Sequence, residues 1–95
     1  MSTNFCETAT RVLDIEAKAI TGLKTYINQD FNDACQLFFN TRGRVIVSGM
    51  GKSGHIGNKI AATLASTGTP AFFVHPGEAS HGDLGMITQS DVVLA

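Results

Sequence analysis

Proline is scarce, tryptophan is absent and charge of either sign is sparse in this sequence. Its 95 residues include 2 prolines, 16% charged residues and 43% hydrophobic residues, and the net charge is -1. So little proline beside so much apolar content excludes a disordered linker and indicates one small packed domain. The absence of a basic field argues against nucleic-acid binding. No apolar run approaches the ~18 residues that a membrane span requires, so we expect no membrane contact.

Cysteine is also scarce. Cys6 and Cys35 are far apart and form no C-x-x-C pair. Each falls on the apolar stripe of a predicted helix, so we expect two buried free thiols. Free thiols are typical of a reducing compartment, and the N-terminus lacks the charged-then-apolar pattern of a signal peptide. We therefore expect a cytoplasmic protein.

Two helices are predicted before the first strand. Apolar residues at spacings of three and four predict a helix over residues ~4–27 and a second over ~31–41. The segment 28–30 offers an N-cap, and Gly43 is a natural stop. We interpret residues 1–43 as a helical leader for packing or oligomerisation.

The rest of the chain alternates between strand and helix. Consecutive apolar residues predict a buried strand at 44–48 and a second strand at 71–74, with a helix at ~55–67 between them and a third strand from about Asp91. This order predicts a doubly wound α/β fold, a parallel sheet flanked by helices. Because such a sheet has further strands, we expect residues 44–95 to be the first part of a longer domain, incomplete at its C-terminus.

A glycine-rich turn follows the first predicted strand. Gly49, Gly51 and Gly54 match the pattern G-x-G-x-x-G, in the strand–loop–helix context that the dinucleotide-binding motif requires. In such a turn the backbone approaches an anion, and the N–H groups of the following helix bind it. The turn therefore predicts an anion site.

The anion is better explained by a phosphate monoester than by a dinucleotide. A dinucleotide site expects an acidic residue where the second strand ends, and that residue is His75. Lys52 and Ser53 suit a terminal phosphate, which carries more charge. A Walker A loop is excluded, because its first glycine would have to replace Ile46 in mid-strand. An NAD enzyme stays an alternative, which titration with NADH would test.

A second polar loop follows the second predicted strand. It carries His75, Glu78 and His81. Because carboxyl ends of parallel strands share one edge, we expect these residues at the same edge as Lys52. The histidines could move protons or bind zinc, although a six-residue spacing is not typical of zinc ligands. The alternative is that they bond to the loop backbone. His55, in the first helical turn, either contacts an anion or is solvated.

Three stretches carry a family resemblance. Residues 49–57, 61–78 and 81–86 resemble D-arabinose 5-phosphate isomerases, which belong to the sugar isomerase (SIS) domain superfamily. The resemblance is strong over 44–95 and looser over the leader. It implies a flavodoxin-like sheet and the interconversion of D-ribulose 5-phosphate and D-arabinose 5-phosphate through an enediol. In that family the reaction opens the route to Kdo, a sugar of lipopolysaccharide.

The resemblance also implies roles for individual residues. Lys52 and His81 resemble catalytic residues, His81 also binds substrate, and Gly68 and Thr69 resemble a substrate-contacting pair. His75 resembles a histidine that binds zinc, which inhibits these enzymes and is not required by them. From the turn itself we add further substrate-binding residues: Gly49, Gly51 and Ser53.

The sequence leaves the assembly, the exact function and the pathway open. The resemblance implies a homotetramer, further active-site residues after residue 95 and in many members a pair of CBS domains. The 95 residues alone are therefore expected to be inactive. A non-catalytic SIS module that senses a phosphosugar is the alternative function. The pathway is also open, because related isomerases serve lipopolysaccharide, capsule or sugar-alcohol metabolism.

Overall fold

A computed structural model describes residues 4–95. The chain divides into two compact units that meet between Asp33 and Ala34, and each is described by itself. Within the described residues, no helix combines the length and the apolar character needed to cross a bilayer.

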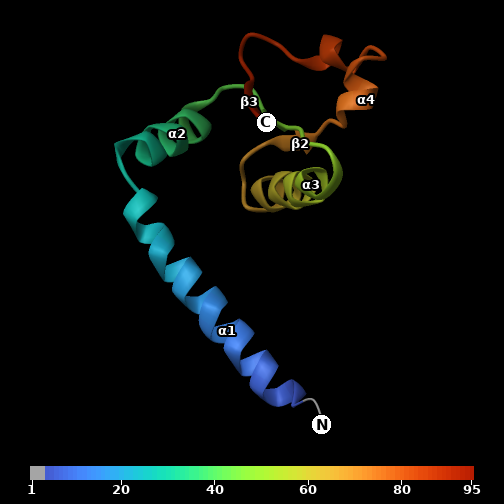
Figure 1. Ribbon diagram of the computed structural model, residues 1–95. Coiled ribbons are helices and arrows are strands. Elements are labelled where there is room, and N and C mark those ends of the chain that lie inside the picture. The colour runs from blue at the N-terminus through green and yellow to red at the C-terminus, as the bar shows by residue number, and fades with distance from the viewer. Residues whose placement is uncertain (1–3) are drawn as a thin grey trace. The chain divides into compact units, whose positions relative to one another are not determined.

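The first unit is mainly one long helix. Helix α1 (Phe5–Gly22) starts where the Asn4 side chain accepts a 3.1 Å hydrogen bond from the Glu7 N–H. Its last turn tightens into the 3₁₀ helix η1 (Leu23–Tyr26; Figure 1). The predicted helix over 4–27 is thus confirmed, except that its end is 3₁₀ and not α-helical.

Helix α2 (Gln29–Asn40) starts at the predicted cap, because the Asn28 side chain accepts a 3.3 Å hydrogen bond from the Phe31 N–H. The role predicted for Gly43 is wrong. The helix ends before it, and Gly43 does not have a positive φ. A Cβ at Gly43 would lie 2.5 Å from the carbonyl oxygen of Ser90, so glycine is required there for close backbone packing.

The prediction of buried cysteines is wrong. Cys6 and Cys35 are both exposed free thiols. None of the described residues of α1 or α2 is buried, so most of each apolar stripe that suggested burial is uncovered. A helical stripe shows which face is apolar, but only the tertiary structure shows whether that face is covered.

The second unit is built on a three-stranded parallel sheet. Strands β1 (Val45–Val47), β2 (Ala71–Phe73) and β3 (Val92–Leu94) are arranged in the order β2-β1-β3. Ile46 is level with Phe72 on one side and Val93 on the other. All three residues of β1 are at most 2% exposed, which confirms the buried central strand. The α/β class with a parallel sheet is likewise confirmed.

Helix α3 (Gly51–Ser66) packs on one face of the sheet, and it begins one turn earlier than predicted. Its buried residues are Gly57 and Ala61. A Cβ at Gly57 would lie 3.1 Å from Val47, so small residues allow the close helix–sheet approach. The larger Ile56 stays 63% exposed because it lies off this face.

The connection from β2 to β3 contains helix α4 (Pro76–Ala79) and the 3₁₀ helix η2 (Asp83–Met86). It passes on the side of the strands opposite α3 (Figure 1). This agrees with right-handed crossovers that run in opposite directions from β1 and from β2.

Arg44 and Asp91 fasten the end of this connection to the sheet. The Arg44 guanidinium donates a 2.7 Å hydrogen bond to the Met86 carbonyl and lies 4.6 Å from the centre of the Phe72 ring. The Asp91 carboxylate is 1% exposed and accepts hydrogen bonds from the N–H groups of Arg44 (2.7 Å) and Thr88 (2.8 Å). These bonds lower the pKa of Asp91.

Candidate active site

The turn between β1 and α3 forms the first part of the candidate site. Gly51 has a φ of +60°, which residues with a side chain rarely adopt. A glycine is therefore required where the chain enters α3. Gly49 and Gly54 serve a different purpose. A Cβ at Gly54 would lie 2.7 Å from the Gly49 carbonyl oxygen, so these two glycines allow the turn to close on itself.

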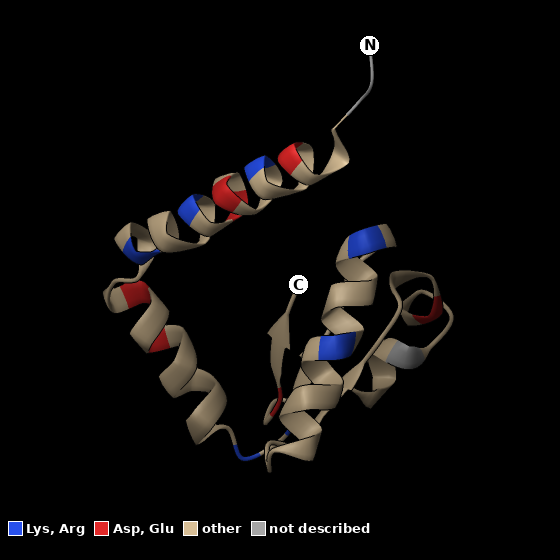
Figure 2. Ribbon diagram, turned by 90° about the horizontal axis from the view of Figure 1, so that it is seen from below, with Lys and Arg blue, Asp and Glu red and all other residues tan. Residues whose placement is uncertain are grey.

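The N-terminus of α3 is suited to an anion. The first hydrogen bond of the helix runs from the Gly54 N–H to the Met50 carbonyl (3.2 Å). The N–H groups before it, those of Gly51, Lys52 and Ser53, therefore have no acceptor within the helix. Lys52 is exposed in this turn, and no acidic residue accompanies it. Figure 2 shows cationic residues alone on α3, whereas α1 carries both signs. The dipole and the lysine charge therefore favour the same ligand sign.

Ser48 joins the carboxyl ends of all three strands. Its hydroxyl donates a 2.6 Å hydrogen bond to the Val74 carbonyl, and its N–H donates a 2.9 Å bond to the Leu94 carbonyl. Ser48 is not among the site residues predicted from the sequence. The sequence signal that could have indicated Ser48 is its place as the first polar residue after a buried apolar run.

The second loop is partly helical. The His75 imidazole Nδ1 accepts a 3.0 Å hydrogen bond from the Gly77 N–H at the start of α4. Glu78 lies in that helix, and its carbonyl accepts a 3.0 Å bond from the His81 N–H. The side chains of His75, Glu78 and His81 are exposed.

A hollow of about 350 Å³ connects the two loops. Its lining comprises Gly51, Gly54, His55, Asn58, Phe73 and His75. His55 lines this hollow together with His75 and is exposed, so its contact with an anion stays a prediction. Asn58 was missed, although its helical spacing from Gly51 and Gly54 places it on their face.

A second hollow of about 280 Å³ lies where the strand order reverses, between β1 and β3. Its lining is mostly apolar and includes Ser48, Ser53 and Leu94. In doubly wound sheets this reversal is the usual ligand position. The described linings of these two hollows include neither Lys52 nor His81, which are both exposed.

Gly68 and Thr69 are not brought to this edge. They follow the C-terminus of α3, a helix of 16 residues that spans ~24 Å. Gly68 has a φ of +103°, and the Thr69 N–H donates a 2.9 Å bond to the Leu64 carbonyl. Within one chain they lie at the end of α3 opposite Lys52, and their substrate contact stays a prediction.

The described side chains around His75 do not form a metal site. Among the side chains that the structure describes, no group of three or more His, Cys, Asp or Glu is arranged to hold a metal ion. In addition, the Nδ1 of His75 already accepts the Gly77 N–H. The described side chains alone therefore do not complete a donor set for zinc, and metal binding by His75 stays a prediction.

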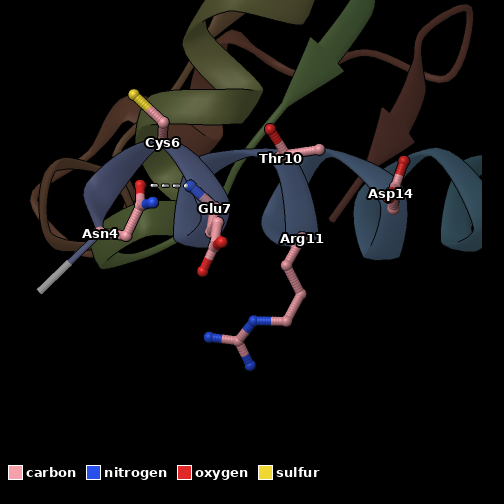
Figure 3. Close-up of a pocket in the computed structure, with 6 residues that line it drawn as sticks. All are labelled: Asn4, Cys6, Glu7, Thr10, Arg11 and Asp14. Carbon is pink, nitrogen blue, oxygen red and sulfur yellow. Dashed lines mark hydrogen bonds between the residues drawn. The ribbon is translucent and has the colours of Figure 1, made fainter.

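A further hollow of about 400 Å³ lies on α1. Six side chains line it: Asn4, Cys6, Glu7, Thr10, Arg11 and Asp14. All come from the start of the same helix, and Cys6 and Arg11 point to opposite sides of it (Figure 3). Side chains that diverge from one helix do not form a converging site, so we assign it no function.

The comparison with known families identifies the class of protein. The sequence model of the SIS domain matches residues 37–95. The chain therefore belongs to the SIS domain family. The fold agrees, because a protein of Escherichia coli CFT073 solved in complex with a phosphosugar matches with a TM-score of 0.82 and 40% identity, over 96% of this chain and 50% of that one.

Similar proteins narrow the class. Arabinose 5-phosphate isomerase KdsD of Yersinia pestis is 64% identical over 92 residues, and that of Pseudomonas aeruginosa is 61% identical. Each match covers 97% of this chain and 28% of the relative, so the chain spans 28% of the length of these curated relatives.

Proposed function

We propose that the full-length protein is an aldose–ketose isomerase that interconverts D-ribulose 5-phosphate and D-arabinose 5-phosphate. Two observations carry the proposal. The chain is 64% identical to a protein named arabinose 5-phosphate isomerase. In addition, α3 begins after a buried parallel strand, and its first turn contains a lysine and no acidic residue.

The phosphate is expected at the N-terminus of α3. The N–H groups of Gly51, Lys52 and Ser53 and the helix dipole stabilise a dianion there. Lys52 adds a full positive charge, either on the phosphate or on the oxygen that becomes negative during the reaction. Gly49 has no side chain, so its proposed contribution is to the shape of the turn and through its backbone.

The chemistry is a proton shift between neighbouring carbons. A base removes a proton from C1 of the ketose, the C2 carbonyl oxygen is protonated, and a cis-enediol results. The O1–H proton then leaves as the aldehyde forms, and C2 receives a proton. One carbon is oxidised as the other is reduced, so we propose that no cofactor is required. His81, on the same edge of the sheet, is proposed to bind substrate and move protons.

We further propose a cytoplasmic homotetramer that serves Kdo and lipopolysaccharide biosynthesis. Support for the oligomer comes from the exposed apolar side chains of the first unit, such as Leu13 (66% exposed) and Ile20 (69% exposed). Light scattering of the full-length protein would measure the assembly directly.

A coupled assay with D-ribulose 5-phosphate tests the enzyme. Saturable turnover to D-arabinose 5-phosphate by the full-length protein is expected. Saturable binding without turnover would favour the alternative, a regulatory SIS module. An NADH fluorescence titration separates the third option, because a dinucleotide enzyme would bind NADH and a phosphosugar isomerase would not.

A further inference from the structure

His75 is the N-terminal cap of α4. Its backbone is extended, with φ −68° and ψ 134°, and its Nδ1 lies 3.0 Å from the Gly77 nitrogen. Pro76, the first residue of α4, has no N–H, so the N–H of Gly77 is the first backbone donor of the helix that needs an acceptor. The imidazole takes the role that an Asn, Asp or Ser side chain has at most helix starts.

The cap selects one tautomer of the ring. A backbone N–H can only donate, so Nδ1 of His75 must present its lone pair to Gly77. The proton of the neutral ring is then on Nε2. A metal-binding histidine donates its second ring N–H to an acceptor. Metal binding through Nε2 would place that proton on Nδ1, opposite the Gly77 N–H, and would break the cap.

Gly77 makes room for the ring. A Cβ at position 77 would lie 3.2 Å from Nδ1 and 3.5 Å from Cε1 of His75. A methyl group there would therefore require the imidazole to shift by a few tenths of an ångström, which disturbs its bond from the Gly77 N–H. His75 accepts this hydrogen bond, and the small size of Gly77 leaves room for it.

Backbone bonds continue from the cap to His81. The His75 carbonyl accepts a 3.0 Å bond from the Ala79 N–H. The Ser80 hydroxyl donates a 2.7 Å bond to the Gly77 carbonyl, and the His81 N–H donates to Glu78. Four residues are too few for a helix to be stable on its own, so the cap has a large effect on whether this segment is ordered.

We propose that His75 is a positioning residue: through its Nδ1 cap it orders α4 and thereby holds His81 at the edge of the sheet, and it does not serve as a metal ligand. The part that concerns His81 rests on the proposed isomerase function.

Substitutions at both ends of the bond test the proposal in the full-length protein. His75→Ala removes the acceptor, and we expect kcat/KM to fall about fivefold, the effect of losing a cap of ordinary strength. His75→Asn supplies a side chain that caps well, and it should restore kcat/KM to within about twofold of the wild type. Gly77→Ala, which keeps the imidazole, should cost about as much as His75→Ala.

A matched control and two contrary results complete the kinetic test. Gly85→Ala adds a methyl group where no atom lies within 4 Å, and it should leave kcat/KM unchanged. The proposal is overturned if His75→Asn is as impaired as His75→Ala, because the imidazole itself is then needed. Full activity of Gly77→Ala would overturn it as well.

Side-chain ¹⁵N NMR tests the cap without any activity. We expect His75 to give the signals of a single Nε2–H tautomer, unchanged by an equivalent of zinc, and Gly77→Ala to give a mixture of tautomers. Proton transfer to Nδ1 with zinc on Nε2 would contradict the proposal. If the protein lacked isomerase activity, this spectrum would still decide the role of His75.

Discussion

The hydroxyl of Ser48 donates a 2.6 Å hydrogen bond to the carbonyl oxygen of Val74, across the gap between the ends of β1 and β2. The same residue is bonded to β3 through its N–H and the Leu94 carbonyl. Because both loops of the candidate site start from these strand ends, the Ser48 bonds add to the backbone bond from the Val74 N–H to the Val47 carbonyl (2.8 Å) in holding the loops together.

Ser48→Ala should destabilise the protein by about 1–2 kcal/mol, because a half-buried donor is lost and the Val74 carbonyl loses its partner. Urea unfolding would measure the loss. Ser66→Ala is the matched control: its hydroxyl bonds to the Thr63 carbonyl on the exposed surface of α3, and its removal should cost less than about 0.5 kcal/mol. Equal effects of the two substitutions would show that Ser48 has no special role.

Lys52→Ala in the full-length protein should lower kcat at least ~100-fold and leave the unfolding temperature unchanged, because the exposed lysine supplies charge for the reaction and packs against nothing buried. The coupled isomerase assay measures it. Lys59→Ala removes an exposed charge from the same helix, and it should keep wild-type turnover. Unchanged turnover in Lys52→Ala would remove this lysine from the site.

Gly51→Ala should cost about 1–2 kcal/mol, because the φ of +60° is strained for any residue with a Cβ. No atom lies within 4 Å of the added methyl group, so the effect isolates backbone strain from packing. Thermal unfolding would measure it. Gly85→Ala is a control without positive φ, and it should be neutral or slightly stabilising. A neutral Gly51→Ala would show that the turn relaxes freely.

Asp91→Asn should destabilise the sheet in a pH-dependent way. Hydrogen bonds from the Thr88 and Arg44 N–H groups lower the pKa of Asp91 from its ordinary value, so its carboxylate stabilises the fold fully above the pKa of an unfolded Asp. As the pH falls through the lowered pKa, this contribution is lost. The stability difference between the wild type and Asp91→Asn, measured by urea unfolding at several pH values, should therefore shrink below pH ~4. A constant difference would exclude the carboxylate charge as its cause.

Local signals made much of the fold predictable. Three consecutive β-branched residues predicted the buried strand from Val45 to Val47, and Asn28 predicted the start of α2. Both signals act over a few residues. The start of α3 was missed, because Gly51 and Gly54 are poor helix formers and the glycine-rich turn was predicted to be a loop.

The candidate site was predictable in its location more than in its contacts. Parallel strands bring the turn with Lys52 and the loop with His75 to one edge, and that follows from strand order alone. The participation of His55 and Asn58 depends on how α3 lies against Phe73.

The sequence by itself determined the α/β class, the glycine-rich turn that predicts an anion site and the family resemblance, because each depends on residue types at short spacing. Only the tertiary structure decided that Cys6 is exposed, that Asp91 binds Arg44 across 47 positions of sequence, and that His75 caps α4. Burial depends on which surfaces meet, and a hydrogen bond depends on where its partner lies in space. Neither is contained in the periodicity of one segment.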